Sequence, residues 1–167
     1  MCGIAGLIDP SLSTAQVTDR VRGAVDALVH RGPDDQGTFC EEGVGIGIRR
    51  LSIIDVEGGH QPIANEAETV HVVCNGEIYN YLDLRKELET RGHVFKTRSD
   101  VEVIVHLYEE YGLDFVQHLR GMFALAIWDA KEQRLVLARD RAGQKPLFYR
   151  QDDDRFVFAS ELKALLQ

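Results

Sequence analysis

The chain has 167 residues, a length typical of one domain, and 44% of them are hydrophobic, enough to form a buried core. Its 19 lysine and arginine residues against 27 aspartate and glutamate residues give a formal net charge of −8. This acidic balance argues against nucleic acid and against an anionic membrane surface as partners. With no signal peptide before Cys2 and no apolar run long enough to span a membrane, we expect a cytoplasmic protein.

Hydrophobic periodicity predicts the following elements in chain order. They are a strand at 4–8, a helix at 15–30 capped by Ser13 or Thr14, a hairpin of 36–40 with 44–49, and a strand at 69–74 that ends in a turn at Asn75-Gly76. Helices at 81–91 and 100–111 follow, the second capped by Ser99 or Asp100, and then hairpins of 122–129 with 134–139 and 147–150 with 155–159, and a short helix at 160–166. This order predicts one α+β domain over residues 1–167, with antiparallel sheets and helices packed outside them.

Cysteine and histidine spacing gives no sign of a disulfide framework or a metal centre. Cys2, Cys40 and Cys74 are odd in number and widely spaced, and the six histidines include no HxH or HExxH pair. We therefore expect no metal in this chain.

Cys2 directly follows the initiator methionine, so removal of Met1 would leave it with both a thiol and a free α-amine. A thiol is intrinsically very nucleophilic. The reference pKa of an α-amine, about 7.7–8.0, lies close to that of a thiol, about 8.5, so the amine can act as the general base. Judged by itself, Cys2 is better explained as a buried structural cysteine.

Three further stretches place polar side chains at expected strand ends or turns, where function often lies. An arginine at 49–50 can hold a carboxylate through two hydrogen bonds. The Asn75 amide and the Gly76 N–H can form an oxyanion hole, and the acids of the SDVE stretch at 99–102 can bind an ammonium group. Each stretch has a structural alternative, namely a solvated charge, a hairpin turn and a helix cap. Together with Cys2 they suit an α-amino acid that has an electrophilic side-chain carbonyl.

The order of the sequence motifs then resembles a known family. The motifs are MCGIAG at 1–6, HRGPD at 30–34, RLSIID at 50–55, GHQP at 59–62, NGEIYN at 75–80, SDVE at 99–102, GMFA at 121–124 and RDRAG at 139–143. Over essentially the whole chain they are similar to the class II glutamine amidotransferase domain of glutamine-hydrolysing asparagine synthetases.

This resemblance implies an N-terminal nucleophile hydrolase fold, a four-layer αββα sandwich of two antiparallel sheets between helices. It implies that Cys2 attacks the side-chain amide of L-glutamine, forms a thioester, and releases ammonia and then glutamate. By motif position, Arg50 would hold the α-carboxylate and Asn75 with the Gly76 N–H would form the oxyanion hole. The remaining implied roles are α-ammonium binding by Glu77 and Asp100, pocket lining by Leu51, Ser52, Ile53 and Ile54, and ordering of the site by Arg31 and Asp34.

In this family the ammonia passes to a C-terminal synthetase domain that uses ATP and Mg. The sequence ends at Gln167 and has no Ser-Gly-Gly-x-Asp-Ser nucleotide motif, so we expect no cofactor in this chain and a synthetase domain or partner that receives the ammonia. The alternatives are a fragment of a longer synthetase or a free-standing module, and an exposed apolar face would allow a homodimer.

Other acceptors, such as a glycan, a peptide or another acid, are alternatives to aspartate. A non-catalytic domain of the same fold and a cysteine–histidine hydrolase are further alternatives.

Overall fold

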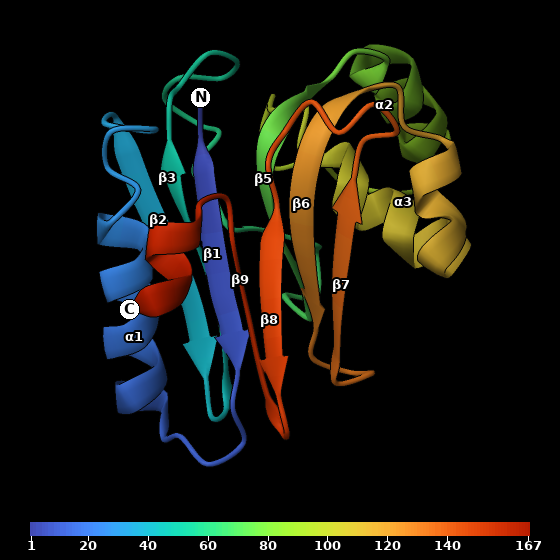
Figure 1. The fold of residues 1–167 in the computed structure, drawn as a ribbon. Coiled ribbons are helices and arrows are strands. Elements are labelled where there is room, and N and C mark those ends of the chain that lie inside the picture. Colours follow the sequence, from blue (N-terminus) through green and yellow to red (C-terminus); the bar gives the residue numbers. More distant parts are fainter.

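A computed structural model describes all residues, 1–167, as two antiparallel sheets between helices (Figure 1). The first sheet has the order β2-β3-β1-β9-β8 and the second β4-β5-β6-β7. The strands are β1 (Gly3–Ile8), β2 (Asp35–Glu41), β3 (Val44–Arg50), β4 (Ile63–Ala64), β5 (Val70–Ile78), β6 (Gly121–Asp129), β7 (Arg134–Arg139), β8 (Phe148–Asp152) and β9 (Arg155–Ala159). The helices are α1 (Thr14–Asp26), α2 (Tyr81–Thr90) and α3 (Val103–Tyr111), with 3₁₀ turns η1 (Gly112–Gln117) and η2 (Leu162–Leu166).

The two faces of β3 pack against different layers, the second sheet on one side and α1 on the other. Val44, Ile46 and Ile48 project between the sheets, where they pack with residues of β6 and with Phe158. Gly45 and Gly47 face the other way, toward the valines of α1. Because these glycines carry no side chain, α1 packs closely against the outer face of the first sheet.

The second sheet is covered on its outer face by α2 and α3 (Figure 1). Val72 and Cys74 of β5 and Leu125 of β6 pack under these helices, whereas Val73 and Ala124 face the first sheet. The order of layers is therefore helix, sheet, sheet, helix, and the predicted αββα architecture is confirmed. No helix has the length and apolar character needed to cross a membrane.

Most predicted elements are present with boundaries shifted by a few residues, but two predictions are wrong. Asn75-Gly76 is not a turn, because β5 continues through it to Ile78 and pairs with β6 along its whole length. The helix predicted at 100–111 begins only at Val103, and Asp100 does not cap it. Its carboxylate instead accepts a hydrogen bond from the Ile78 N–H, at 2.7 Å, so tertiary contact has replaced local capping.

At the start of α1, by contrast, the predicted cap is present. Ser13 is the N-cap, and it forms a capping box with Gln16, as residues of these types favour. The helix ends at Asp26 rather than near His30, and turns carry the chain on to Arg31.

We predict that Gly47→Ala destabilises the protein. An added Cβ would lie 2.7 Å from Val25 Cγ2 and 3.0 Å from Val21 Cγ1, and these stiff β-branched side chains cannot easily move. We expect a loss of about 1–3 kcal/mol in the free energy of unfolding, measured by urea denaturation. Gly23→Ala in α1 is the control, because its nearest atom lies 3.8 Å away, and it should stabilise the helix by about 0.5–1 kcal/mol. Equal effects of the two substitutions would contradict this account of the packing.

Candidate active site

A pocket of about 160 Å³ lies where the contact between the two sheets ends. The central polar side chains of the pocket lie at or near the ends of three strands, and each is two positions from an apolar residue, a spacing that puts both on one face of an extended chain. The pairs of apolar and polar residues are Ile4 with Cys2, Ile48 with Arg50, and Val73 with Asn75. The apolar residue of each pair packs in the layer between the sheets, and the polar residue lines the pocket.

The Cys2 thiol lies at the mouth of this pocket, immediately before β1. The Leu51 N–H faces its Sγ at 3.4 Å, and Sγ lies 3.7 Å from the Leu51 carbonyl oxygen. Cys74 also lines the pocket, but burial raises the pKa of its thiol well above the usual value, so Cys2 is the better nucleophile.

Arg50 is 4% exposed and holds the loop that closes one side of the pocket. Its Nη2 donates to the carbonyl oxygens of Ile54 and Asp55, each at 2.8 Å, and Nη1 donates to that of Val56 at 3.4 Å. These three bonds leave Nε and part of Nη1 free to meet a ligand carboxylate.

Asn75 is 1% exposed, and its side-chain Nδ2 has no hydrogen-bond partner in the protein. Buried polar groups are nearly always paired, so an unpaired donor in a pocket needs a functional explanation. The adjacent Gly76 also lines the pocket, and a side chain there would collide with the backbone oxygen of Met122. The backbone beside Asn75 therefore stays open to a ligand.

Two acids, Glu77 and Asp100, lie on the same pocket. Glu77 follows Asn75 on the same face of β5. Burial raises the pKa of Asp100, as does the nearby charge of Glu77, while the Ile78 N–H and the positive charge of Arg50 oppose the shift. Two carboxylates next to one arginine form a dipolar site that matches the ammonium and carboxylate groups of an amino acid.

Arg31 and Asp34 support this site from outside the pocket. Arg31 Nε donates to the Cys2 carbonyl oxygen at 2.8 Å, and its Nη1 donates to Glu161 Oε1 at 2.9 Å. The Asp34 carboxylate accepts from the Ser52 N–H at 2.9 Å and so holds the loop after β3. These bonds fix the backbone on both sides of the Cys2 thiol.

Most of the residues that the sequence singles out line this pocket; Arg31, Asp34 and Ser52 do not. Leu51, Ile53 and Ile54 line the pocket, but Ser52 lies on a neighbouring shallow surface with Asp34. Sequence reasoning assigned no site role to several other lining residues, namely Gln61, Cys74, Ser99, Val101, Met122 and Lys145. The GHQP motif contained the signal for Gln61, whose Oε1 accepts from the Cys74 N–H at 2.7 Å.

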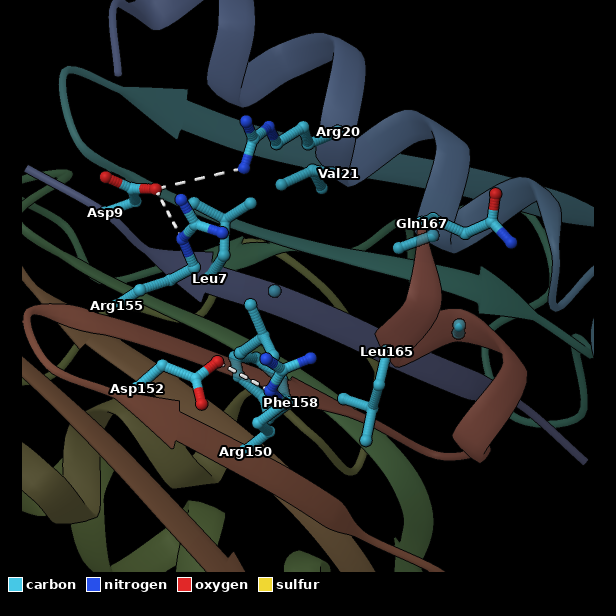
Figure 2. Close-up of a pocket in the computed structure, with 14 residues that line it drawn as sticks. Leu7, Asp9, Arg20, Val21, Arg150, Asp152, Arg155, Phe158, Leu165 and Gln167 are labelled. Carbon is cyan, nitrogen blue, oxygen red and sulfur yellow. Dashed lines mark hydrogen bonds and ion pairs between the residues drawn. The ribbon is translucent and has the colours of Figure 1, made fainter. Parts of the chain in front are cut away.

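A second hollow lies between α1 and strands β1 and β9, and it shares no residue with the Cys2 pocket (Figure 2). Its charged side chains are already paired, as Figure 2 shows: Arg155 Nε lies 2.9 Å from Asp9 Oδ2, and Arg150 Nε lies 2.5 Å from Asp152 Oδ2. It contains no nucleophile and no unpaired buried polar group. The Cys2 pocket is therefore the candidate active site.

Comparison with known proteins agrees with this geometry. The model of the glutamine amidotransferase domain family matches residues 1–167, and the chain belongs to that family. It is 47% identical over 99% of its length to asparagine synthetase [glutamine-hydrolyzing] 1 of Bacillus subtilis (strain 168), and 44% identical over 99% to asparagine synthetase [glutamine-hydrolyzing] of Zea mays. It is also 39% identical over 99% to amidase chry2 of Gibberella zeae. The family resemblance that the motifs predict is confirmed.

The same relatives are much longer than this chain, which covers 27%, 28% and 26% of them. Among solved structures, the glutamine phosphoribosylpyrophosphate amidotransferase of Bacillus subtilis matches 98% of this chain and 43% of its own, with a TM-score of 0.80 at 22% identity. The allosteric regulatory enzyme of purine biosynthesis gives a TM-score of 0.82 with the same coverage and identity. These structures confirm the predicted N-terminal nucleophile hydrolase fold.

We predict that Glu161 makes a pH-dependent contribution to stability. Burial raises its pKa, but hydrogen bonds from Arg31 and His30 outweigh this and lower it from 4.5 to about 2. The contribution should therefore be complete above pH 4.5 and be lost as the pH falls toward 2. We expect Glu161→Gln to cost about 1–2 kcal/mol at pH 7, allowing for partial exposure, and much less at pH 3.

Urea denaturation of both proteins at pH 7, 5, 4 and 3 measures this difference. Glu132→Gln is the control, because Glu132 is 60% exposed and lies 3.8 Å from Arg134. It should change stability by less than about 0.5 kcal/mol at any pH. A cost for Glu161→Gln that stays constant down to pH 3 would contradict the prediction.

Proposed function

We propose that this chain hydrolyses the side-chain amide of L-glutamine through Cys2, to give glutamate and ammonia. The observation that carries the proposal is the unpaired, buried Nδ2 of Asn75 in the same pocket as the Cys2 thiol. A donor without a partner is ready for a charge that develops only during the reaction. The family membership of the whole chain supports this assignment.

Substrate binding follows from the charges around the pocket. Arg50 offers its remaining donors to the α-carboxylate of glutamine, and Glu77 and Asp100 accept the α-ammonium group. Because Arg50 also holds the carbonyl oxygens of the 54–56 loop, it joins substrate binding to the shape of the pocket wall. The side-chain amide then extends toward Cys2 and Asn75.

In the chemical step, the α-amine of Cys2 takes the thiol proton after Met1 has been removed. Sγ attacks the amide carbon, and the oxyanion accepts hydrogen bonds from Asn75 Nδ2 and the Gly76 N–H. The carbon–nitrogen bond breaks as the nitrogen takes the proton from the amine and leaves as ammonia. Water attacks the thioester, its proton returns to sulfur, and glutamate is released.

We further propose that the ammonia passes to an ATP-dependent asparagine synthetase domain, where ATP and Mg would bind. The names of the bacterial and plant relatives support this acceptor. A fungal amidase that is 39% identical over nearly the whole chain keeps another acceptor open as the second candidate. The amidotransferase pocket is the same in both cases, because the acceptor is bound elsewhere.

The nucleophile is tested by replacing Cys2 with alanine. We expect glutamate release from glutamine to fall to background, because no other pocket group has an accessible thiol. Cys40→Ala is the matched control, since Cys40 is a half-buried cysteine outside the pocket, and its activity should remain normal. Intact mass of each protein establishes whether Met1 has been removed. Turnover in Cys2→Ala, or no turnover in a wild-type chain that lacks Met1, would reject the proposal.

The oxyanion role is tested by Asn75→Ala. We expect kcat to fall about 10²–10³-fold with little change in KM, because the amide donates to the substrate oxygen mainly in the transition state. Asn80→Ala in the same motif is the control. Asn80 bonds to the His118 carbonyl oxygen and the Arg120 N–H, so its loss should lower stability and leave kcat within a few-fold. A wild-type kcat in Asn75→Ala would make Asn75 a structural residue only.

A further inference from the structure

A second cluster of chemically active side chains lies far from the sheet interface, beside α3. Glu66 follows β4, His93 follows α2, and His106 and Glu109 lie three residues apart on one face of α3. These four residues each place a potential ligand atom within 4.8 Å of the others. The cluster contributes nothing to the Cys2 pocket, so the proposed amide hydrolysis leaves it unexplained.

Four separations between these side chains are close to those of a small coordination sphere, with Glu66 presenting a different oxygen to each histidine. His93 Nδ1 lies 3.2 Å from Glu66 Oε1 and 3.9 Å from Glu109 Oε2. His106 Nδ1 lies 3.4 Å from Glu66 Oε2 and 3.4 Å from Glu109 Oε2. Tetrahedral zinc with bonds of about 2.0–2.2 Å has ligands about 3.3–3.5 Å apart. The observed separations scatter about that value.

Both histidines also have a carboxylate at the ring nitrogen that faces away from the cluster. His93 Nε2 lies 3.3 Å from Glu110 Oε1, and His106 Nε2 lies 3.9 Å from Glu102 Oε1. At His93 this carboxylate is within hydrogen-bond distance and stabilises the tautomer with the proton on Nε2, which leaves the Nδ1 lone pair directed at the cluster; at His106 the 3.9 Å separation is too long for a hydrogen bond. This carboxylate–histidine arrangement is typical of metal-binding histidines.

The carboxylate ligands are held in place by neutral donors. Glu66 Oε1 accepts from the Val94 N–H at 2.9 Å, and Glu109 Oε1 accepts from Asn65 Nδ2 at 2.7 Å. His106 itself is 1% exposed in its side chain, and its Nε2 has no hydrogen-bond partner within normal distance. Two carboxylates lie beside this buried imidazole, so a bound metal cation would balance their charge.

We propose that Glu66, His93, His106 and Glu109 form a structural Zn²⁺ site. Two imidazole nitrogens and two carboxylates are ligands that zinc accepts, and four protein ligands close the coordination sphere as in structural sites. The metal joins the β4–β5 loop, the end of α2 and the middle of α3. The sequence predicted no metal because the ligands come from three separate segments, and only His106 and Glu109 show local spacing.

Calorimetric titration with ZnCl₂ tests the site directly. The chain is treated with a chelator and carries Cys2→Ser, because a reactive thiol also binds zinc. We expect one equivalent of zinc to bind and to raise Tm, since a ligand that binds only the folded state stabilises it. His93→Ala and Glu109→Gln should each weaken binding by more than about tenfold. Both side chains are partly exposed, at 13% and 29%, so these variants should fold, as circular dichroism checks.

His118→Ala is the matched histidine control. His118 stacks on Tyr111 with ring centroids 3.9 Å apart and lies outside the cluster, so zinc affinity and stoichiometry should remain unchanged. Absence of saturable binding to the parent chain would overturn the proposal. Undiminished binding in both His93→Ala and Glu109→Gln would also overturn it, because the zinc would then occupy other residues.

Discussion

The site depends on the way the two sheets meet. The layer between the sheets is formed by alternate residues of each strand, which share one face. Beyond the last apolar residue on that face of each strand, the same alternation continues for one more position. Ile4, Ile48 and Val73 belong to the packed layer, and the next residues on those faces are polar. Cys2, Arg50 and Asn75 therefore line one pocket near the ends of these strands. The core residues and the pocket residues lie on the same strands, so the packed core holds the pocket side chains in position.

The unpaired Asn75 amide shows what this arrangement costs. A buried donor without a partner destabilises a fold by about 1–3 kcal/mol. Nearby polar groups are satisfied, since the Cys74 N–H bonds to Gln61 and the Ile78 N–H bonds to Asp100. Among the residues that line the pocket, Asn75 Nδ2 is the only buried side-chain polar atom without a hydrogen-bond partner. An unpaired buried donor is expected where function requires it, and the other interactions of the fold offset its cost in stability.

The sequence predicted the fold well where local rules and tertiary packing agree. Hairpins such as β6–β7 and the capped start of α1 follow directly from alternation and capping residues. It failed at Asn75-Gly76, because the dipeptide favours a turn locally, whereas nine paired residues of β5 hold it extended. It failed at Asp100 because the carboxylate bonds to β5 instead of the helix, a contact between distant segments that capping rules cannot reveal. The motifs indicated the candidate site residues, but no motif contains Lys145, and the GMFA motif did not indicate that Met122 lines the pocket.

Arg50 shows why a residue role inferred from a motif needs the structure beside it. As a carboxylate clamp alone, it would affect only substrate affinity. In the structure its guanidinium also holds three successive carbonyl oxygens of the 54–56 loop, and the neighbouring Leu51 N–H faces the Cys2 sulfur. Loss of the guanidinium would therefore release residues 54–56 of the loop whose first residue, Leu51, contacts the Cys2 sulfur. Under the proposed function, Arg50 would serve both substrate binding and the shape of the loop beside Cys2, because a planar group with five donors can do both.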